Sequence, residues 1–196
     1  MLAKWKLSEI IVLSVLAVVF GVVYLAFVQL GNVMAGIMGP IGYEWIFGIW
    51  FIVSIIAAYI LRKPGTAFLS ETIAGTVEVL IGSATGPMLI VTAMVQGAGA
   101  EAVFAATRYK RWSVWVLMLA GMGSSVTSFA WSYFISGYGA LDSGYVTLMF
   151  VLRLASGAIL AGLLGKWISD GLYQTGVLNS YAIARAKKRD TYEEAS

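Results

Sequence analysis

Acidic and amide side chains lie in two stretches that are otherwise apolar enough to enter a lipid bilayer. Glu71 and Glu78 belong to the first stretch, and Gln96 and Glu101 belong to the second. An ionisable residue inside a membrane segment is costly, so it generally faces a partner or a cavity and indicates a functional site. Glu71 and Glu78 are seven residues apart, which on a helix places them on one face, about 10 Å apart.

The types of these residues favour a cationic, ring-shaped ligand. One basic residue, Arg153, stands in the apolar segments against four acidic ones, which are Glu44, Glu71, Glu78 and Glu101. Carboxylates accept pairs of N–H bonds, and the amides of Gln96 and Asn32 both donate and accept, which suits an aminopyrimidine or an amidine-like ring. Trp131 is a candidate to stack on such a ring or to hold a cation over its face, as are Tyr24, Trp45 and Trp50.

Each candidate also has a structural interpretation. Glu71 or Glu101 would equally form an ion pair with Arg153 or cap a neighbouring helix. Glu44 would equally be solvated near the membrane surface, and Trp131 would equally belong to an interfacial belt of aromatic residues. The sequence leaves these alternatives open.

The composition places the chain among multi-span membrane proteins. Hydrophobic residues make up 60% of the chain, charged residues 12%, and the mean hydropathy is +0.85, well above the range of soluble domains. The absence of Cys and His excludes disulfides, thiol nucleophiles and Ser-His catalysis, so we expect no catalytic, metal or cofactor site. The net charge of +3 comes from basic residues beside membrane segments, and nucleic acid is not an expected partner.

Hydropathy predicts an all-α membrane protein with six transmembrane helices, at 8–30, 41–61, 66–82, 87–107, 113–136 and 145–170. The connections 31–40, 83–86 and 137–144 contain no Lys or Arg, whereas the termini and the other connections are basic. The positive-inside rule therefore predicts that both termini are cytoplasmic. We expect one membrane domain over residues 1–179 and a charged cytoplasmic tail over 180–196.

The predicted orientation concentrates the polar residues in the outer half and the middle of the membrane, as a cavity opening outward would require. The uncharged, Gly-rich connection 31–42 is either a lid over this cavity or an ordinary loop. Ala17 and Gly21 are small residues four apart, a spacing that permits close helix contact in lipid. We expect Ala17 and Gly21 to dock a partner membrane protein.

Several segments spread over nearly the whole chain carry a specific pattern. They include Val95-Gln-Gly-Ala-Gly-Ala-Glu-Ala-Val-Phe104 and the ranges 27–36, 39–44, 48–54, 62–65, 108–111, 126–131 and 162–167. This pattern closely resembles the YkoE family, the substrate-binding S components of energy-coupling factor (ECF) transporters for thiamine or its hydroxymethylpyrimidine (HMP) precursor.

The resemblance implies a six-helix protein of the bacterial cytoplasmic membrane that captures the vitamin outside the cell. It further implies partners, namely a transmembrane T component and cytoplasmic ATPases that hydrolyse ATP, so the chain itself is not expected to be an enzyme. Carried over by motif, Asn32 and Glu44 border the outer loop, Glu78 and Gln96 line the pocket, and Trp131 lies beside it. Glu71 is a further expected contact.

Two other functions fit the polar residues taken alone. A proton-coupled secondary transporter of organic cations would use the membrane glutamates as proton carriers. A membrane enzyme that relies on carboxylates is the remaining class, and the lack of His and Cys counts against it.

Overall fold

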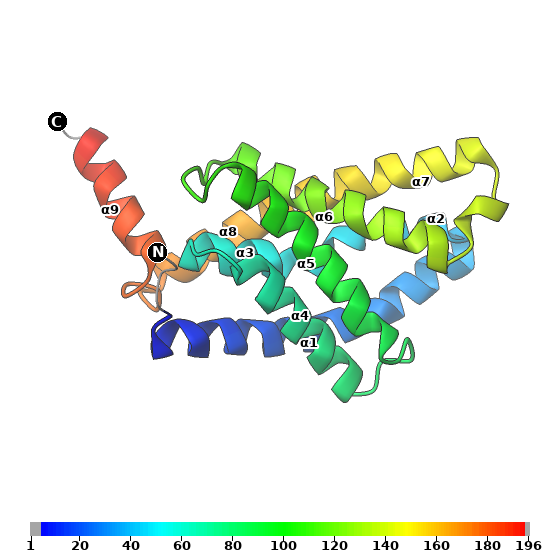
Figure 1. Ribbon diagram of the computed structural model, residues 1–196, viewed down its shortest axis with the longest axis horizontal. Coiled ribbons are helices and arrows are strands. Elements are labelled where there is room, and N and C mark those ends of the chain that lie inside the picture. The colour runs from blue at the N-terminus through cyan, green and yellow to red at the C-terminus, as the bar shows by residue number, and fades with distance from the viewer. Residues whose placement is uncertain (1–4, 195–196) are drawn as a thin grey trace.

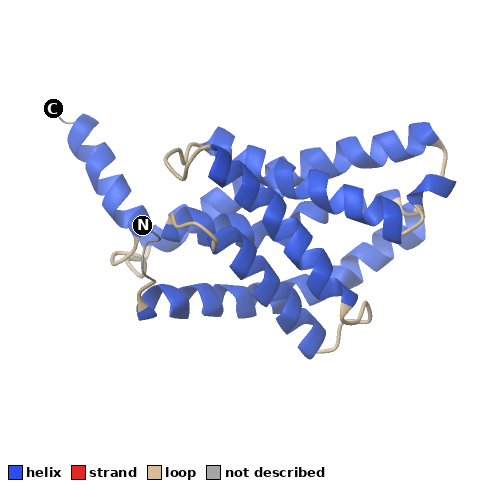
Figure 2. Ribbon diagram, viewed as in Figure 1, coloured by secondary structure: helices blue, strands red, loops and turns tan. Residues whose placement is uncertain are grey.

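The computed structural model describes the backbone of residues 5–194 and the side chains of residues 5–189, and this part of the chain is helical. Apolar residues throughout each segment favour helices, because only a helix satisfies its own backbone hydrogen bonds in lipid. The elements in chain order are α1 (Leu7–Met38), α2 (Ile41–Glu44), the 3₁₀ helix η1 (Phe47–Phe51), α3 (Ile52–Leu61), α4 (Thr66–Leu80), α5 (Met88–Ala106), α6 (Val114–Ile135), the 3₁₀ turn η2 (Tyr138–Ala140), α7 (Ser143–Ser156), the π-helix η3 (Gly157–Leu164), α8 (Gly165–Gln174) and α9 (Ala182–Glu194) (Figures 1 and 2).

Four stretches of the described chain are long and apolar enough to cross a membrane: Leu7–Met38, Met88–Ala106, Val114–Ile135 and Ser143–Gln174. The last of these runs without a break through α7, η3 and α8. The chain is thus an all-helical protein with several membrane-spanning helices, and four of the six predicted spans have a counterpart of full length.

The other two predicted spans differ from ordinary membrane helices. Residues 41–61 divide into α2, η1 and α3, of which only Phe47–Leu61 is a continuous apolar helix. The fourth helix, α4, has 15 residues and carries both Glu71 and Glu78, so it is shorter and more polar than a standard span.

The expected loop at residues 31–42 is mostly helix, which corrects the sequence analysis. Helix α1 continues to Met38, and α2 begins at Ile41. The connection is a turn at Gly39 and Pro40, with Gly39 at a φ of 75°, a backbone conformation that glycine adopts readily. The expectation of a long loop at residues 31–42 was therefore wrong, and whether this stretch covers the cavity stays a prediction.

The helices surround a core centred on α3, whose ten residues are all buried. Helices α4, α5 and α6 follow one another across the bundle, and α6 lies beside α7 (Figure 1). The contact between α5 and α6 is close because a Cβ built on Gly123 would lie 2.6 Å from the carbonyl oxygen of Gly99. Both ends of the chain lie at the same end of the molecule, from which α9 projects (Figure 1).

Helices α1 and α4 meet at the small residues of α1. Ala17 is fully buried, and a Cβ on Gly21 would lie 2.8 Å from the carbonyl oxygen of Ala74 and 2.9 Å from Cβ of Val77. Gly21, expected on a partner-docking face, instead lies against α4 of the same chain, and Ala17, four residues earlier, is buried within the same chain. Small residues permit a close approach to any neighbouring helix. Their spacing alone therefore did not distinguish a helix of a partner protein from a helix of the same chain.

Candidate functional site

A cavity of about 320 Å³ lies among α1, η1, α4, α5 and α6, near the end of the molecule opposite the termini. Its wall includes residues of the connections at that end, among them Thr85 and Tyr138. The lining residues are Tyr24, Val28, Tyr43, Phe47, Trp50, Glu71, Gly75, Glu78, Thr85, Leu89, Thr92, Ala93, Gln96, Ser132, Ile135, Ser136 and Tyr138. The cavity therefore combines an aromatic and aliphatic wall with a few polar groups, as small-molecule sites do.

Glu71 supplies the most unusual polar group of the cavity. The side chain is fully buried, and its Oε2 accepts a hydrogen bond of 3.2 Å from the Tyr24 hydroxyl. The Tyr24 oxygen in turn accepts a 3.2 Å hydrogen bond from the backbone N–H of Val53. Among the buried side-chain nitrogen and oxygen atoms of the described residues, Oε1 of Glu71 is the one without a hydrogen-bond partner. An unsatisfied buried acceptor is costly, so this oxygen is suited to receive a donor from a ligand.

Glu78 and Gln96 also belong to the polar lining, as the sequence analysis expected. Both side chains are buried, and both line the cavity. Oε1 of Glu78 accepts a long hydrogen bond of 3.4 Å from the Ser83 hydroxyl. Helix α5 holds Gln96 against α6, because the Gln96 carbonyl accepts a 2.8 Å bond from the hydroxyl of Ser124.

Aromatic rings from the segment after α1 form another wall. The Trp50 ring lies 5.8 Å from the Tyr43 ring and 5.7 Å from the Phe47 ring, centroid to centroid, and all three line the cavity. The tilted arrangement of the rings is a favourable one for aromatic pairs. Trp50 was among the expected stacking residues, whereas Tyr43 and Phe47 were not.

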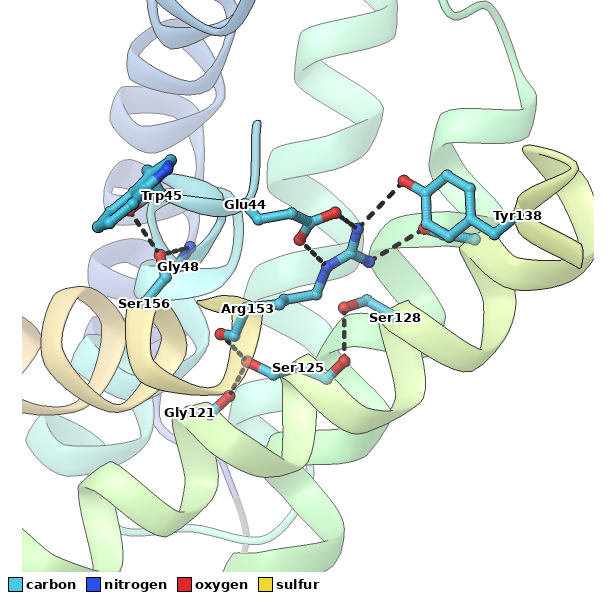
Figure 3. Close-up of polar contacts among 10 residues, drawn as sticks. Glu44, Trp45, Gly48, Gly121, Ser125, Ser128, Tyr138, Arg153 and Ser156 are labelled. Atoms are coloured by element: carbon cyan, nitrogen blue, oxygen red, sulfur yellow. Dashed lines mark hydrogen bonds and ion pairs between the residues drawn. The ribbon is translucent and has the colours of Figure 1, made fainter. Parts of the chain in front are cut away.

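Glu44 and Arg153 form an ion pair next to the cavity (Figure 3). The Nε of Arg153 donates to Oε2 of Glu44 and a terminal nitrogen donates to Oε1, both over 2.6 Å. The same guanidinium donates to the Ser132 hydroxyl at 3.1 Å and to the Tyr138 hydroxyl at 3.4 Å. Its central carbon lies 3.6 Å from the centroid of the Phe47 ring.

This arrangement gives Glu44 a supporting position. Glu44 is absent from the cavity lining, but Phe47, Ser132 and Tyr138, which contact Arg153, all belong to it. The ion pair therefore holds one side of the cavity in place from behind. The sequence had considered Arg153 as a partner of Glu71 or Glu101, and the structure gives it Glu44 instead.

Asn32 and Trp131 also lie behind lining residues. Oδ1 of Asn32 accepts a hydrogen bond from the Tyr43 hydroxyl, and Asn32 is exposed. The indole N–H of Trp131 donates to the hydroxyl of Thr92 over 2.9 Å. Neither side chain is part of the cavity wall, so each orients a residue that is.

Comparison with known proteins agrees with this geometry. The model of the family described as "ABC-type cobalt transport system, permease component" matches residues 8–127. The protein YkoE of Bacillus subtilis (strain 168), whose name gives it as a proposed HMP/thiamine permease, is 60% identical over 186 residues, which cover 95% of this chain and 94% of that protein. The chain belongs to the YkoE family.

A solved structure gives the same assignment for the fold of this YkoE-family chain. The crystal structure of an S component of an ECF transporter superposes with a TM-score of 0.93 at 58% identity, covering 98% of this chain and 99% of that one. The chain is thus an S component, a transport subunit of the cell membrane and not an enzyme. The resemblance noted in the sequence is confirmed.

Glu101 has no part in the cavity of this YkoE-family chain. Its carboxylate accepts hydrogen bonds from the backbone N–H groups of Gly65, Ala67 and Phe68, at 2.6, 3.0 and 3.3 Å, and so caps the first turn of α4. The Tyr109 hydroxyl donates to it over 2.6 Å. Burial and this hydrogen bond raise the pKa of Tyr109 well above its ordinary value, which keeps the phenol a donor.

Proposed function

We propose that this S component captures thiamine or its HMP precursor in the cavity lined by Glu71, Glu78 and Gln96. The observation that carries the proposal is the unpartnered Oε1 of the buried Glu71 in a cavity of suitable size and polarity. The curated relative YkoE bears the name of an HMP/thiamine permease. Membership of the S-component family favours this function over the proton-coupled transporter considered from the sequence.

The proposal assigns a separate task to each polar group. The 4-amino group of the pyrimidine donates to Oε1 of Glu71, and Gln96 exchanges hydrogen bonds with the ring nitrogens. The aromatic wall at Trp50 stacks on a ring. Glu78 lies about two turns along α4 from Glu71, on the same face, and stabilises the positive thiazolium of thiamine, a charge that HMP lacks.

The family description names cobalt, and the donor set of this cavity supports an organic ligand instead. Imidazole is a common ligand of the later first-row transition metals, and the sequence contains no His or Cys. The described residues include no group of three or more His, Cys, Asp or Glu side chains that would hold a metal ion.

The proposal includes the topology expected from the sequence. Six membrane segments, with the 41–61 segment and α4 as the shorter two, leave both termini in the cytoplasm and the cavity near the outer face. The location of both chain ends at one end of the molecule supports this orientation, as do the basic connections. Residues 1–179 then form the membrane domain and 180–196 the cytoplasmic tail, with a T component and ATPases as partners.

Ligand binding to the purified protein tests the proposal. Thiamine, its phosphates and HMP are titrated separately while the fluorescence of Trp50, in the cavity wall, and of the other Trp residues is followed. We expect saturable quenching at micromolar thiamine or HMP, and weaker binding of the phosphates because their negative charge meets Glu71 and Glu78. Absence of saturable binding for every member of the series would overturn the proposal. Saturable binding of Co²⁺ by a protein that binds none of these organic ligands would overturn it as well.

A further inference from the structure

Two rings of the cavity's aromatic wall are carried by a short and irregular stretch of backbone. Phe47 and Trp50 belong to η1, a 3₁₀ helix of five residues, which follows the four-residue helix α2. A 3₁₀ helix has poorer hydrogen-bond geometry than an α-helix, and the first N–H groups of a helix have no partner within it. The position of the two rings therefore depends on contacts that η1 makes with other parts of the chain.

The hydroxyl of Ser156 supplies such a contact at the start of η1 (Figure 3). It accepts a hydrogen bond of 2.9 Å from the backbone N–H of Gly48 and donates one of 3.1 Å to the carbonyl of Trp45. Ser156 is buried. A hydroxyl has one hydrogen to donate, so Ser156 commits its donor and an acceptor position to the backbone that leads into η1.

Close packing keeps η1 against this hydroxyl. A Cβ built on Gly48 would collide with the carbonyl oxygen of Ser156 and would lie 3.0 Å from Cβ of Leu160. Glycine permits such a close approach of two backbones because it has no Cβ. The 3₁₀ helix η1 thus rests directly on the long helix that begins as α7 and continues as η3.

This long helix changes type at the point of contact. Ser156 is the last residue of α7, and the π-helix η3 begins at Gly157. Gly157 and Gly162 both lie against α6, since a Cβ on Gly157 would collide with Oγ of Ser125 and one on Gly162 would lie 2.5 Å from a Cα atom of α6. Residues five apart in an α-helix point about 140° apart, whereas the i→i+5 turn of a π-helix brings them toward one face. The π-helix therefore lets the same helix meet α6 through its glycines and η1 through Ser156.

A second anchor on the long helix acts beside Ser156. Arg153 is three residues earlier, which on a helix places it on the same side. Its guanidinium pairs with Glu44, and its central carbon lies 3.6 Å from the centroid of the Phe47 ring. Arg153 thus holds α2 and the first ring, and Ser156 holds the backbone from which Trp50 follows.

We propose that Ser156 is a positioning residue of the cavity, which acts on the ligand through Trp50. By fixing the backbone at Gly48, it holds the Trp50 ring in the orientation in which the ring stacks on the ligand. Ser156 itself is not among the described residues that line the cavity. The inference rests on the proposed function, which gives the stacking role to the aromatic wall at Trp50.

Calorimetric titration of thiamine against the full chain in detergent tests this role. Ser156→Ala removes both hydrogen bonds to the backbone at η1 and should raise the dissociation constant about 3- to 10-fold. Ser169→Ala is the matched control, because Ser169 is a fully buried serine of the same continuous helix whose hydroxyl donates to the Gly165 carbonyl at 2.8 Å. The control should keep the natural affinity, whatever its effect on Tm.

A double-mutant cycle with Trp50→Leu separates positioning from a general loss of stability. When Trp50 is already Leu, Ser156→Ala should change the dissociation constant less than about twofold, because the ring through which it acts is gone. An equal rise in both backgrounds would overturn the proposal. An unchanged affinity in Ser156→Ala, or an equal loss in Ser169→Ala, would overturn it too.

Hydrogen exchange of the protein without ligand gives a measurement that does not depend on titration. Backbone amides of residues 49–53 should exchange about 3- to 10-fold faster in Ser156→Ala than in the natural sequence, and at the natural rate in Ser169→Ala. Unchanged exchange in Ser156→Ala would show that the hydroxyl does not hold η1. A natural protein that binds neither thiamine nor HMP would overturn the proposed function together with this inference, whereas natural binding that Ser156→Ala leaves intact overturns this inference alone.

Discussion

The guanidinium of Arg153 and the carboxylate of Glu44 meet in a two-point ion pair with both side chains fully buried, 109 residues apart in sequence. The pair joins α2 to α7, and it is surrounded by Phe47, Phe129 and Tyr138. Such a pair is stable only when both members are present, because each charge alone would be buried without compensation.

Replacing Glu44 by Gln should destabilise the protein by about 3 to 5 kcal/mol, since the Arg153 charge would remain buried and unpaired. Combining Glu44→Gln with Arg153→Met should recover part of this loss. Thermal unfolding of the two single variants and the double variant measures both effects. A Glu44→Gln protein as stable as the natural one would contradict the assigned role.

Replacing the Glu71 carboxylate by a neutral amide should weaken the binding of thiamine and HMP alike. A hydrogen bond to a charged group contributes about 1.5 to 3 kcal/mol, so Glu71→Gln should raise both dissociation constants about 10- to 150-fold. Asp142→Asn is the matched control, because it removes a carboxylate from the N-cap of α7, outside the cavity, and asparagine caps helices equally well. Unchanged affinity in Glu71→Gln would remove this residue from the site.

Glu78→Gln should separate the two ligands. If Glu78 faces the thiazolium, its neutralisation weakens thiamine binding about tenfold, as loss of an opposite charge in a partly buried site does. HMP carries no such charge and should keep its affinity. Titration of both ligands against the same preparation measures the ratio, and equal losses would place Glu78 away from the thiazolium.

Gly21→Leu should lower the Tm of the isolated protein, because its side chain would collide with Ala74 and Val77 of α4. Overpacking of this kind costs about 1 to 3 kcal/mol. Affinity for thiamine should fall as well, since α4 carries Glu71 and Glu78. Val22→Leu, at a position that is 53% exposed, is the control. A Gly21→Leu protein with natural Tm and impaired only in assembly would restore the partner-docking interpretation.

Glu101→Gln should reduce stability by about 1 to 2 kcal/mol, the usual effect of losing a helix cap, and leave ligand affinity unchanged. The carboxylate holds three backbone N–H groups at the start of α4, where negative charge is also favoured by the helix dipole. Chemical unfolding and ligand titration together distinguish this effect from a role in binding. A selective loss of affinity would show that Glu101 acts on the cavity.

The amino-acid sequence alone determined the class of protein and the chemistry of its cavity. Long apolar runs require helices in lipid. Polar groups such as Glu71, Glu78 and Gln96 are costly to place in a membrane segment, so they indicate a functional site. The structure brings these three into one cavity. Local patterns carry this information because hydropathy and the cost of burial act residue by residue.

The tertiary structure alone decided which acidic residue has which partner. Glu44, Glu71 and Glu101 look alike in the sequence, yet the first pairs with Arg153, the second lines the cavity and the third caps α4. Tyr138 and Phe47 reach the same cavity from elements far apart in the chain. These assignments depend on which helices cross and at what depth in the bundle. Close contacts between helices, such as that of Gly21 with α4, fix the crossings. A contact of this kind involves two segments, so neither segment predicts it by itself.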